Sequence, residues 1–79
     1  MNRFEWAIRA NYATKHLMHE NGDKEVLPFE MYIGKGYELQ MDNPKKWNAI
    51  QELYQLEIAR DLKRGAWDGR KFKFKELPE

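Results

Sequence analysis

The chain contains no cysteine and no serine, and its one threonine is Thr14. Without cysteine it can form neither disulfides nor thiolate metal sites, and without serine or cysteine the common nucleophile–histidine triads cannot be built. No apolar stretch approaches the roughly 20 residues of a membrane span. Arg3, Glu5 and Arg9 interrupt the first residues, where a signal peptide would need a continuous apolar run. We therefore expect a cytoplasmic protein with no membrane segment.

The length predicts one compact domain spanning residues 1–79. Such a domain has a small core, because a chain of this size buries only about 60–65% of the surface that its unfolded form exposes. Three Trp, four Tyr and four Phe are available to fill that core. One or two of these aromatic side chains can instead be exposed anchors of a protein interface, where Trp and Tyr are enriched.

Basic residues are concentrated near the C-terminus. The formal charge of the whole chain is +1, but residues 60–75 carry seven Lys and Arg against two Asp, a net charge of +5. Residues 1–59 carry seven basic against nine acidic residues, a net charge of −2. The C-terminal part is therefore the candidate surface for an anionic partner.

Segment 29–41 has the alternating pattern that predicts a β-hairpin. A three-residue loop, Gly34–Gly36, would place the two apolar sets on one face, with Gly36 in the left-handed conformation. A two-residue loop would place Ile33 opposite Glu38 and so break the match. The apolar positions are Phe29, Met31 and Ile33 before the loop and Tyr37, Leu39 and Met41 after it.

Two helices are predicted, over residues 2–20 and 43–64. Asn2 is a suitable cap for the first, with Glu5 three residues later as the partner of a capping box. Asn43 followed by Pro44 marks the start of the second, and Gly65 marks its end.

The second predicted helix carries two apolar stripes. A helix usually needs only one apolar face to join a core, and the second stripe either widens that face or adds another. The extra stripe can therefore belong to the core or form a contact surface. The first stripe is Trp47, Ile50, Tyr54, Ile58 and Leu62, and the second is Ala49, Leu53 and Leu56.

Residues 70–75 alternate between basic and aromatic side chains, which predicts a third strand. The expected fold class is therefore α+β, in the order α-β-β-α-β, with a three-stranded, mainly antiparallel sheet packed by two helices. A right-handed crossover gives the strand order 2-1-3. Pro28 at the start of the first strand leaves this order open.

Catalytic and metal-binding patterns are weak. His16, His19 and Glu20 lie within one helical turn, but one helix supplies only part of a metal shell, so we interpret the two histidines as surface residues. Gly34–Gly36 lacks the framework of a phosphate loop. Glu57 and Asp61 have basic neighbours and are expected to form solvated salt bridges. No enzyme activity, cofactor or metal is predicted.

The preferred function is a small protein-binding module that acts by occluding or bridging another protein, with a homodimer as a further possibility. As a very small single-domain chain with few catalytic residue types, it is similar in style to the small accessory proteins with which phages and other mobile elements inhibit host proteins. The expected interface follows the second stripe and its charged neighbours: Ala49, Leu53, Leu56, Glu57 and Arg60.

The alternative function is nucleic-acid binding through the basic C-terminal surface. Lysines could neutralise phosphates there, although alternation sends Phe72 and Phe74 to the opposite face, away from stacking contacts with the same ligand. The same lysines could also simply protect a sheet edge. The residues expected to bind nucleic acid are Lys63, Arg64, Arg70, Lys71, Lys73 and Lys75.

Overall fold

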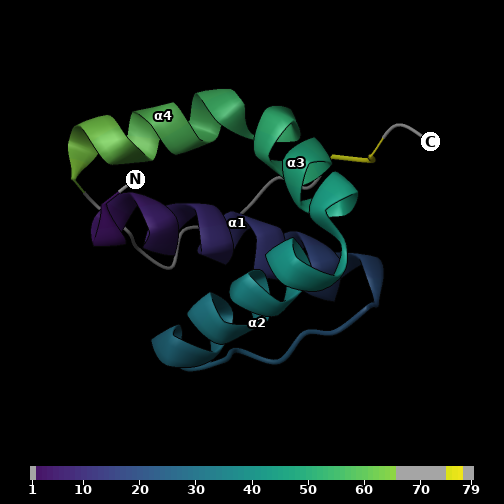
Figure 1. Ribbon diagram of the computed structural model, residues 1–79. Helices are drawn as coiled ribbons and strands as arrows, with labels where there is room; N and C mark the ends of the chain where they lie inside the picture. The colour runs from purple at the N-terminus through teal and green to yellow at the C-terminus, as the bar shows by residue number, and fades with distance from the viewer. Residues whose placement is uncertain (1, 66–74, 78–79) are drawn as a thin grey trace.

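The structure is a computed structural model that describes residues 2–65 and 75–77. The elements in these residues are the helices α1 (Arg3–Glu20), α2 (Phe29–Asp42), α3 (Pro44–Leu53) and α4 (Gln55–Arg64). Helix α1 contacts each of the other three, and α2 and α4 lie on opposite sides of it (Figure 1). The predicted α+β fold with a three-stranded sheet is wrong, because the described residues form helices and no sheet.

The predicted hairpin is helix α2. The buried residues of this segment are Tyr32, Gly36 and Leu39, at spacings of four and three, which is the period of a helix face. The alternating apolar set also fits a helix, because most residues around it are good helix formers and Ile33 is the one β-branched residue. Alternation over 13 residues therefore did not separate the two structures, and packing on α1 selects the helix.

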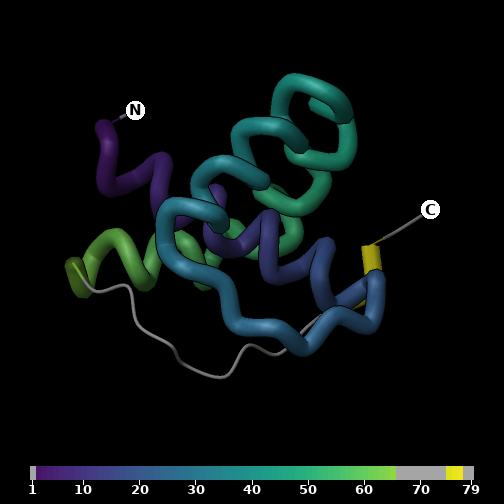
Figure 2. The backbone as a smooth tube through the Cα atoms, turned by 90° about the horizontal axis from the view of Figure 1, so that it is seen from below, coloured from purple at the N-terminus to yellow at the C-terminus, as the bar shows by residue number. Residues whose placement is uncertain are grey.

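Gly36 occupies the crossing of α2 and α1 and is buried. A Cβ atom on Gly36 would lie 2.6 Å from the Ala10 Cβ and 2.9 Å from the Ala10 Cα. The two small residues therefore let the helices approach closely where they cross (Figures 1 and 2). The predicted left-handed conformation of Gly36 is wrong, since the described glycines with positive φ are Gly22 and Gly65.

The predicted helix ends are largely confirmed. The Asn2 Oδ1 accepts a hydrogen bond from the Glu5 N–H at 2.7 Å, and the Asn43 Oδ1 accepts one from the Lys46 N–H at 3.2 Å. Helix α1 ends at Glu20, as expected, and Gly65 follows α4 with φ of 65°. These ends depend on one or two adjacent residues, which is why local sequence predicts them.

The predicted helix over 43–64 is two helices that meet at Tyr54. Helical hydrogen bonds join Tyr54 N–H to Ile50 O and Ile58 N–H to Tyr54 O. The Tyr54 backbone, with φ of −109° and ψ of 19°, departs from helical values, and α4 turns away from α3 (Figure 1). Across this bend Ile50, Tyr54 and Ile58 all remain in the core.

The core lies between α1 and the other helices. It confirms most of the first predicted stripe, and Leu53, Leu62 and Leu77 pack against it from partly buried positions. Residues 70–74 of the predicted third strand lie outside the described residues. Lys75–Leu77 have no regular structure and contact the α3–α4 bend through Tyr54 and Leu53. The core residues are Ile8, Ala10, Tyr12, Ala13, Leu39, Trp47, Ile50, Tyr54 and Ile58.

Candidate functional site

A hydrogen-bonded chain of polar groups runs through the interior around His16. The His16 Nδ1 lies 2.6 Å from the Tyr54 hydroxyl, and its Nε2 lies 3.1 Å from the Glu20 Oε1. The second Glu20 oxygen pairs with the Lys46 ammonium at 2.7 Å. The Tyr54 hydroxyl also accepts the Lys75 N–H at 3.3 Å. This cluster therefore ties together α1, α3, the α3–α4 bend and the C-terminal segment.

The interpretation of His16 as a surface residue is wrong, since its exposed fraction is 1%. Ile8, Tyr12 and His16 follow one another at four-residue steps on α1, and this spacing could have indicated a shared buried face. His19 is exposed, as predicted. The two histidines therefore face different surroundings, and among the described residues no group of acidic or histidine side chains is placed to hold a metal ion.

Burial and pairing shift the pKa values of this cluster in different directions. Burial lowers the pKa of His16 from 6.5, although the Glu20 carboxylate opposes that change. The hydrogen bond from Lys46 holds the pKa of Glu20 below its usual value. Burial raises the pKa of the Tyr54 hydroxyl. At neutral pH the cluster therefore contains a neutral imidazole, a carboxylate and a neutral phenol.

A second buried polar contact joins α1 to α4. The Tyr12 hydroxyl donates a hydrogen bond to the Asp61 carboxylate, and the Arg60 Nε lies 3.5 Å from the other Asp61 oxygen. Burial, and then the Asp61 hydrogen bond, raise the pKa of Tyr12. Asp61 thus has a structural role: it pairs with its basic neighbour Arg60, as the sequence predicts, but it is buried and not solvated.

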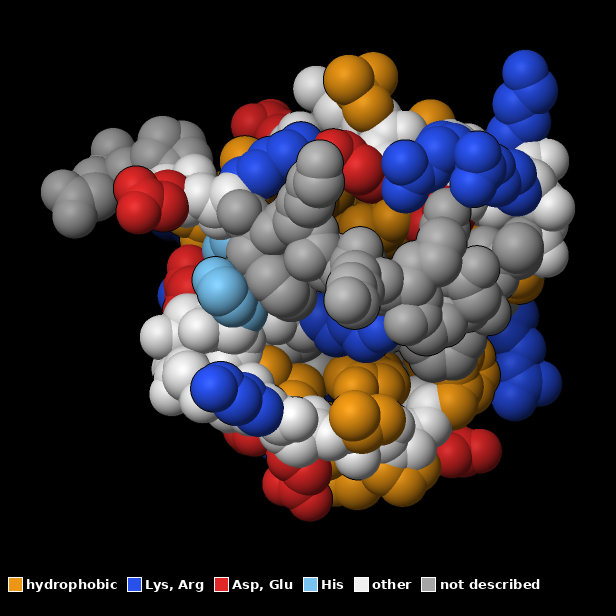
Figure 3. Space-filling model, turned by 180° about the vertical axis from the view of Figure 1, so that it is seen from behind, with side chains coloured by type: hydrophobic (Ala, Val, Ile, Leu, Met, Phe, Trp, Pro, Cys, Tyr) orange, Lys and Arg blue, Asp and Glu red, His pale blue; other side chains and the backbone are white. Residues whose placement is uncertain are grey.

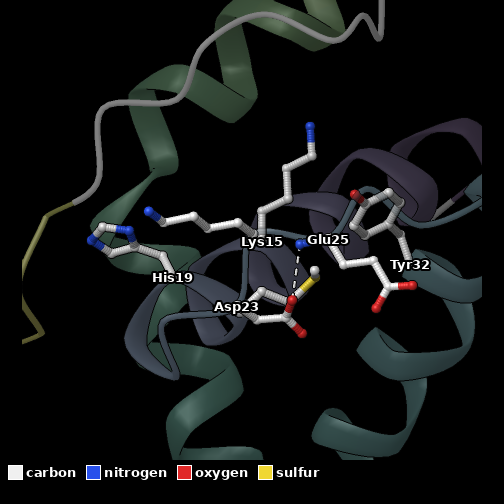
Figure 4. A pocket seen from close by; sticks show the side chains of 7 residues that line it. Lys15, His19, Asp23, Glu25 and Tyr32 are labelled. Carbon is white, nitrogen blue, oxygen red and sulfur yellow. Dashed lines mark hydrogen bonds between the residues drawn. The ribbon is translucent and has the colours of Figure 1, made fainter.

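A shallow hollow lies between the end of α1, the 21–28 loop and the start of α2 (Figure 4). The Asp23 Oδ1 accepts the Glu25 N–H at 2.9 Å, and the Tyr32 hydroxyl accepts the Leu27 N–H at 3.1 Å. These groups order the loop, and the two lysines of the hollow are balanced by two carboxylates. The hollow is lined by Lys15, Met18, His19, Asp23, Lys24, Glu25 and Tyr32.

The structure divides the predicted protein interface between the core and the surface. Leu53 packs against the core, and Ala49 is half-buried. Leu56 projects from α4 with an exposed fraction of 78%. Glu57 pairs with the Lys75 ammonium at 2.5 Å, and the Arg60 side chain is half-exposed. The second stripe is therefore not one continuous contact face.

The predicted nucleic-acid residues are also divided. Lys63 and Arg64 are exposed near the end of α4, where Lys and Arg side chains gather in the space-filling view (Figure 3). Lys75 is engaged by Glu57 and by the Leu53 carbonyl oxygen, 3.2 Å from its Nζ. Arg70, Lys71 and Lys73 lie outside the described residues.

Helix α2 carries an apolar surface whose residues the alternating pattern predicts to be the core face of a hairpin. Phe29, Ile33, Tyr37 and Met41 follow one another at four-residue steps and form what we call the α2 stripe. Tyr37 and Met41 have exposed fractions of 56% and 65%. The helical period explains this, because it spreads an alternating apolar set around the helix.

Trp6 of α1 extends the stripe at its middle. The Trp6 and Tyr37 ring centroids are 6.4 Å apart in an edge-on arrangement, and Trp6 also stacks on the buried Trp47 at 4.9 Å. The exposed Tyr37 ring thus packs against the Trp6–Trp47 pair, which fixes its position. Rigid aromatic side chains of this kind lose little conformational entropy when a partner covers them.

No match was found. Scanning against protein-family models, curated proteins and solved structures gives no significant similarity to this chain. Within residues 2–65 and 75–77, none of the helices combines the length and the apolar character that crossing a membrane requires.

Proposed function

We propose that this protein is a non-catalytic protein-binding module that occludes a surface of its partner with the α2 stripe. The observation that carries the proposal is the exposure of Tyr37 and Met41 in line with Ile33 and Phe29 along one helix. Several neighbouring apolar side chains on one helix are a common docking surface, whereas isolated ones need no explanation.

The charges of α2 indicate the chemistry of the partner. The helix carries three acidic residues, Glu30, Glu38 and Asp42, against one basic residue, Lys35. Glu30 and Glu38 each lie three residues before a stripe member, Ile33 and Met41, and so flank it. The complementary partner is an amphipathic segment with apolar anchors and Lys or Arg at its edges.

Charge substitutions on two sides of α2 test the proposal. A buried unpaired charge should disrupt the contact, so Met41→Asp should weaken partner binding at least tenfold. Met31→Asp is the matched control, because Met31 is an exposed methionine on the same helix but outside the stripe. Binding is measured by calorimetry with the partner that the immobilised wild-type chain retains, and folding by circular dichroism. Folded Met41→Asp protein with wild-type affinity would contradict the proposal.

A second candidate function, nucleic-acid binding, is supported by one observation. Arg60, Lys63 and Arg64 lie on one side of the last turns of α4 and are exposed. Titration of a DNA duplex at several salt concentrations tests it, since each phosphate contact adds about 0.7–0.9 to the slope of log affinity against log salt. Lys63→Ala should reduce that slope by about one contact if α4 binds phosphate. An unchanged salt slope in Lys63→Ala would contradict phosphate binding by α4.

A further inference from the structure

The C-terminal segment Lys75–Leu77 is held on the α3–α4 bend by a small number of contacts. The Lys75 Nζ donates to the Glu57 carboxylate at 2.5 Å and to the Leu53 carbonyl oxygen at 3.2 Å. Its backbone N–H donates to the Tyr54 hydroxyl at 3.3 Å, and Leu77 packs against the core. The Tyr54 hydroxyl is therefore the point at which this segment meets the buried His16 cluster.

The positions of the hydrogens in this cluster are determined by chemistry. The Lys75 N–H can only donate, so the Tyr54 oxygen accepts it. The Glu20 carboxylate can only accept, so the His16 Nε2 carries a hydrogen and donates to it. In a neutral imidazole the Nδ1 is then an acceptor, and the Tyr54 O–H donates to it across 2.6 Å.

Protonation of His16 reverses the bond to Tyr54. The Nδ1 would then carry a hydrogen and become a donor, so the Tyr54 oxygen would have to accept from both His16 and Lys75. The hydroxyl hydrogen would lose its acceptor, because its one acceptor in the described structure is the His16 Nδ1. Tyr54 is buried, and a buried hydroxyl without an acceptor is unfavourable.

Among the described residues, the charges around His16 come from α1, α3 and the C-terminal segment. On α1, the Glu20 carboxylate favours the imidazolium and His19 opposes it when charged. On α3, Lys46 opposes it. Near the α3–α4 bend, the Lys75 ammonium lies 5.5 Å from the Tyr54 ring centroid and is neutralised by Glu57. Glu20 thus makes protonation attainable, and the Tyr54 bond is the contact that it disrupts.

We propose that His16 is a proton-sensitive latch, whose protonation releases Lys75–Leu77 from the α3–α4 bend. Once Lys75 has left, the Tyr54 oxygen accepts a hydrogen bond from His16 alone. The hydroxyl hydrogen then turns toward the position that Lys75 occupied. It also uncovers Leu53 and Glu57, which the C-terminal segment contacts when the latch is closed. The latch does not depend on the α2 stripe and holds whether or not that surface binds a partner.

The experiment follows the Lys75 and Leu77 amides of the full-length, ¹⁵N-labelled chain by NMR between pH 4.5 and 8. We expect the Lys75 amide protection factor to fall at least tenfold as pH is lowered, with the midpoint of the His16 ring titration. Circular dichroism at each pH establishes that the helices remain folded. Constant Lys75 protection while His16 titrates, or loss of protection only when the helices unfold, would overturn the proposal.

Three variants separate the latch from a merely structural role. His16→Gln cannot titrate in this range, so Lys75 protection should become independent of pH. Tyr54→Phe removes the acceptor, so Lys75 protection should be low at every pH. His19→Gln is the matched control, since His19 is exposed one turn away and the wild-type profile should persist. A pH profile in His16→Gln that matches the wild type would also overturn the proposal.

Discussion

Gly36 shows how the absence of one atom determines the packing of two helices. Glycine normally weakens a helix interior by about 1 kcal/mol relative to alanine. At this position the missing side chain lets α2 cross α1 directly over Ala10, where a Cβ would come within 2.6 Å of another. Gly34, in the same helix, has no atom within 4 Å of the equivalent position. The two glycines therefore have opposite consequences for stability.

Alanine substitutions at these two positions should change stability in opposite directions. Gly36→Ala should lower the free energy of unfolding by about 1–2 kcal/mol, because the overlap with Ala10 outweighs the gain in helix propensity. Gly34→Ala should raise it by about 0.5–1 kcal/mol. Urea denaturation measures both. If Gly36→Ala is as stabilising as Gly34→Ala, the close crossing of α1 and α2 is wrong.

One buried polar residue, Asn11, is not explained by its contacts. Asn11 is fully buried on α1, and among the described residues neither atom of its side-chain amide has a hydrogen-bond partner. An amide in that position reduces stability compared with an apolar side chain. Nothing in the described structure explains why an asparagine stands there.

The helices differ in how their ends are fixed. Helices α1 and α3 are each preceded by an asparagine whose side chain caps the first turn, whereas Pro28, the residue before α2, provides no side-chain cap. Helix α2 therefore depends more on its packing against α1, including the hydrogen bond from the Thr14 hydroxyl to the Tyr32 carbonyl oxygen at 2.8 Å. Locally encoded helices and a packing-dependent helix coexist in this small chain.

The cap of α3 can be tested by itself. Asn43→Ala should lower the free energy of unfolding by about 1 kcal/mol, because the Lys46 N–H loses the side-chain oxygen that accepts its hydrogen bond. Asn48→Ala is the control, since Asn48 is exposed within the same helix and alanine is the better helix former. Chemical denaturation of both variants should show loss at residue 43 and a small gain at residue 48.

At the scale of the whole molecule, buried ionisable groups connect stability to pH. The folded state lowers the pKa of His16 below 6.5, so the unfolded chain binds its proton more readily. The pKa of Glu20 is lowered mainly by Lys46, whereas burial would raise that of Glu57 and the Lys75 ammonium reverses the change. The histidine and the two carboxylates therefore act in separate pH ranges.

Stability should fall in two stages on acidification. The first begins as pH falls through 6.5 and ends at the lower folded-state pKa of His16, because in that interval the unfolded state holds more protons. Each unit of difference corresponds to about 1.4 kcal/mol. The second begins below about 4.5, as Glu20 and Glu57 lose their charges. Melting temperatures from pH 8 to 3 should show both stages, and His16→Gln should lack the first.

The predicted sites show which features a local sequence pattern can determine and which it cannot. Leu56 and the basic residues Lys63 and Arg64 are exposed as expected, because charged and apolar periodicity assigns faces on a helix that does form. Leu53 lies against the core instead, and the bend at Tyr54 separates it from Leu56 in the next helix. The spacing of His16 on α1 indicates its buried face once that face is known, whereas the α2 stripe depends on residues 29–42 forming a helix.

The amino-acid sequence by itself determined the ends of α1, the start of α3 and the end of α4, because a cap or a glycine acts on the residues next to it. It also determined the core stripe through Trp47, Ile50 and Ile58. Tertiary structure alone decided that residues 29–42 are a helix. A short segment that satisfies both periods has no strong local preference, so the contact that buries more surface selects its conformation.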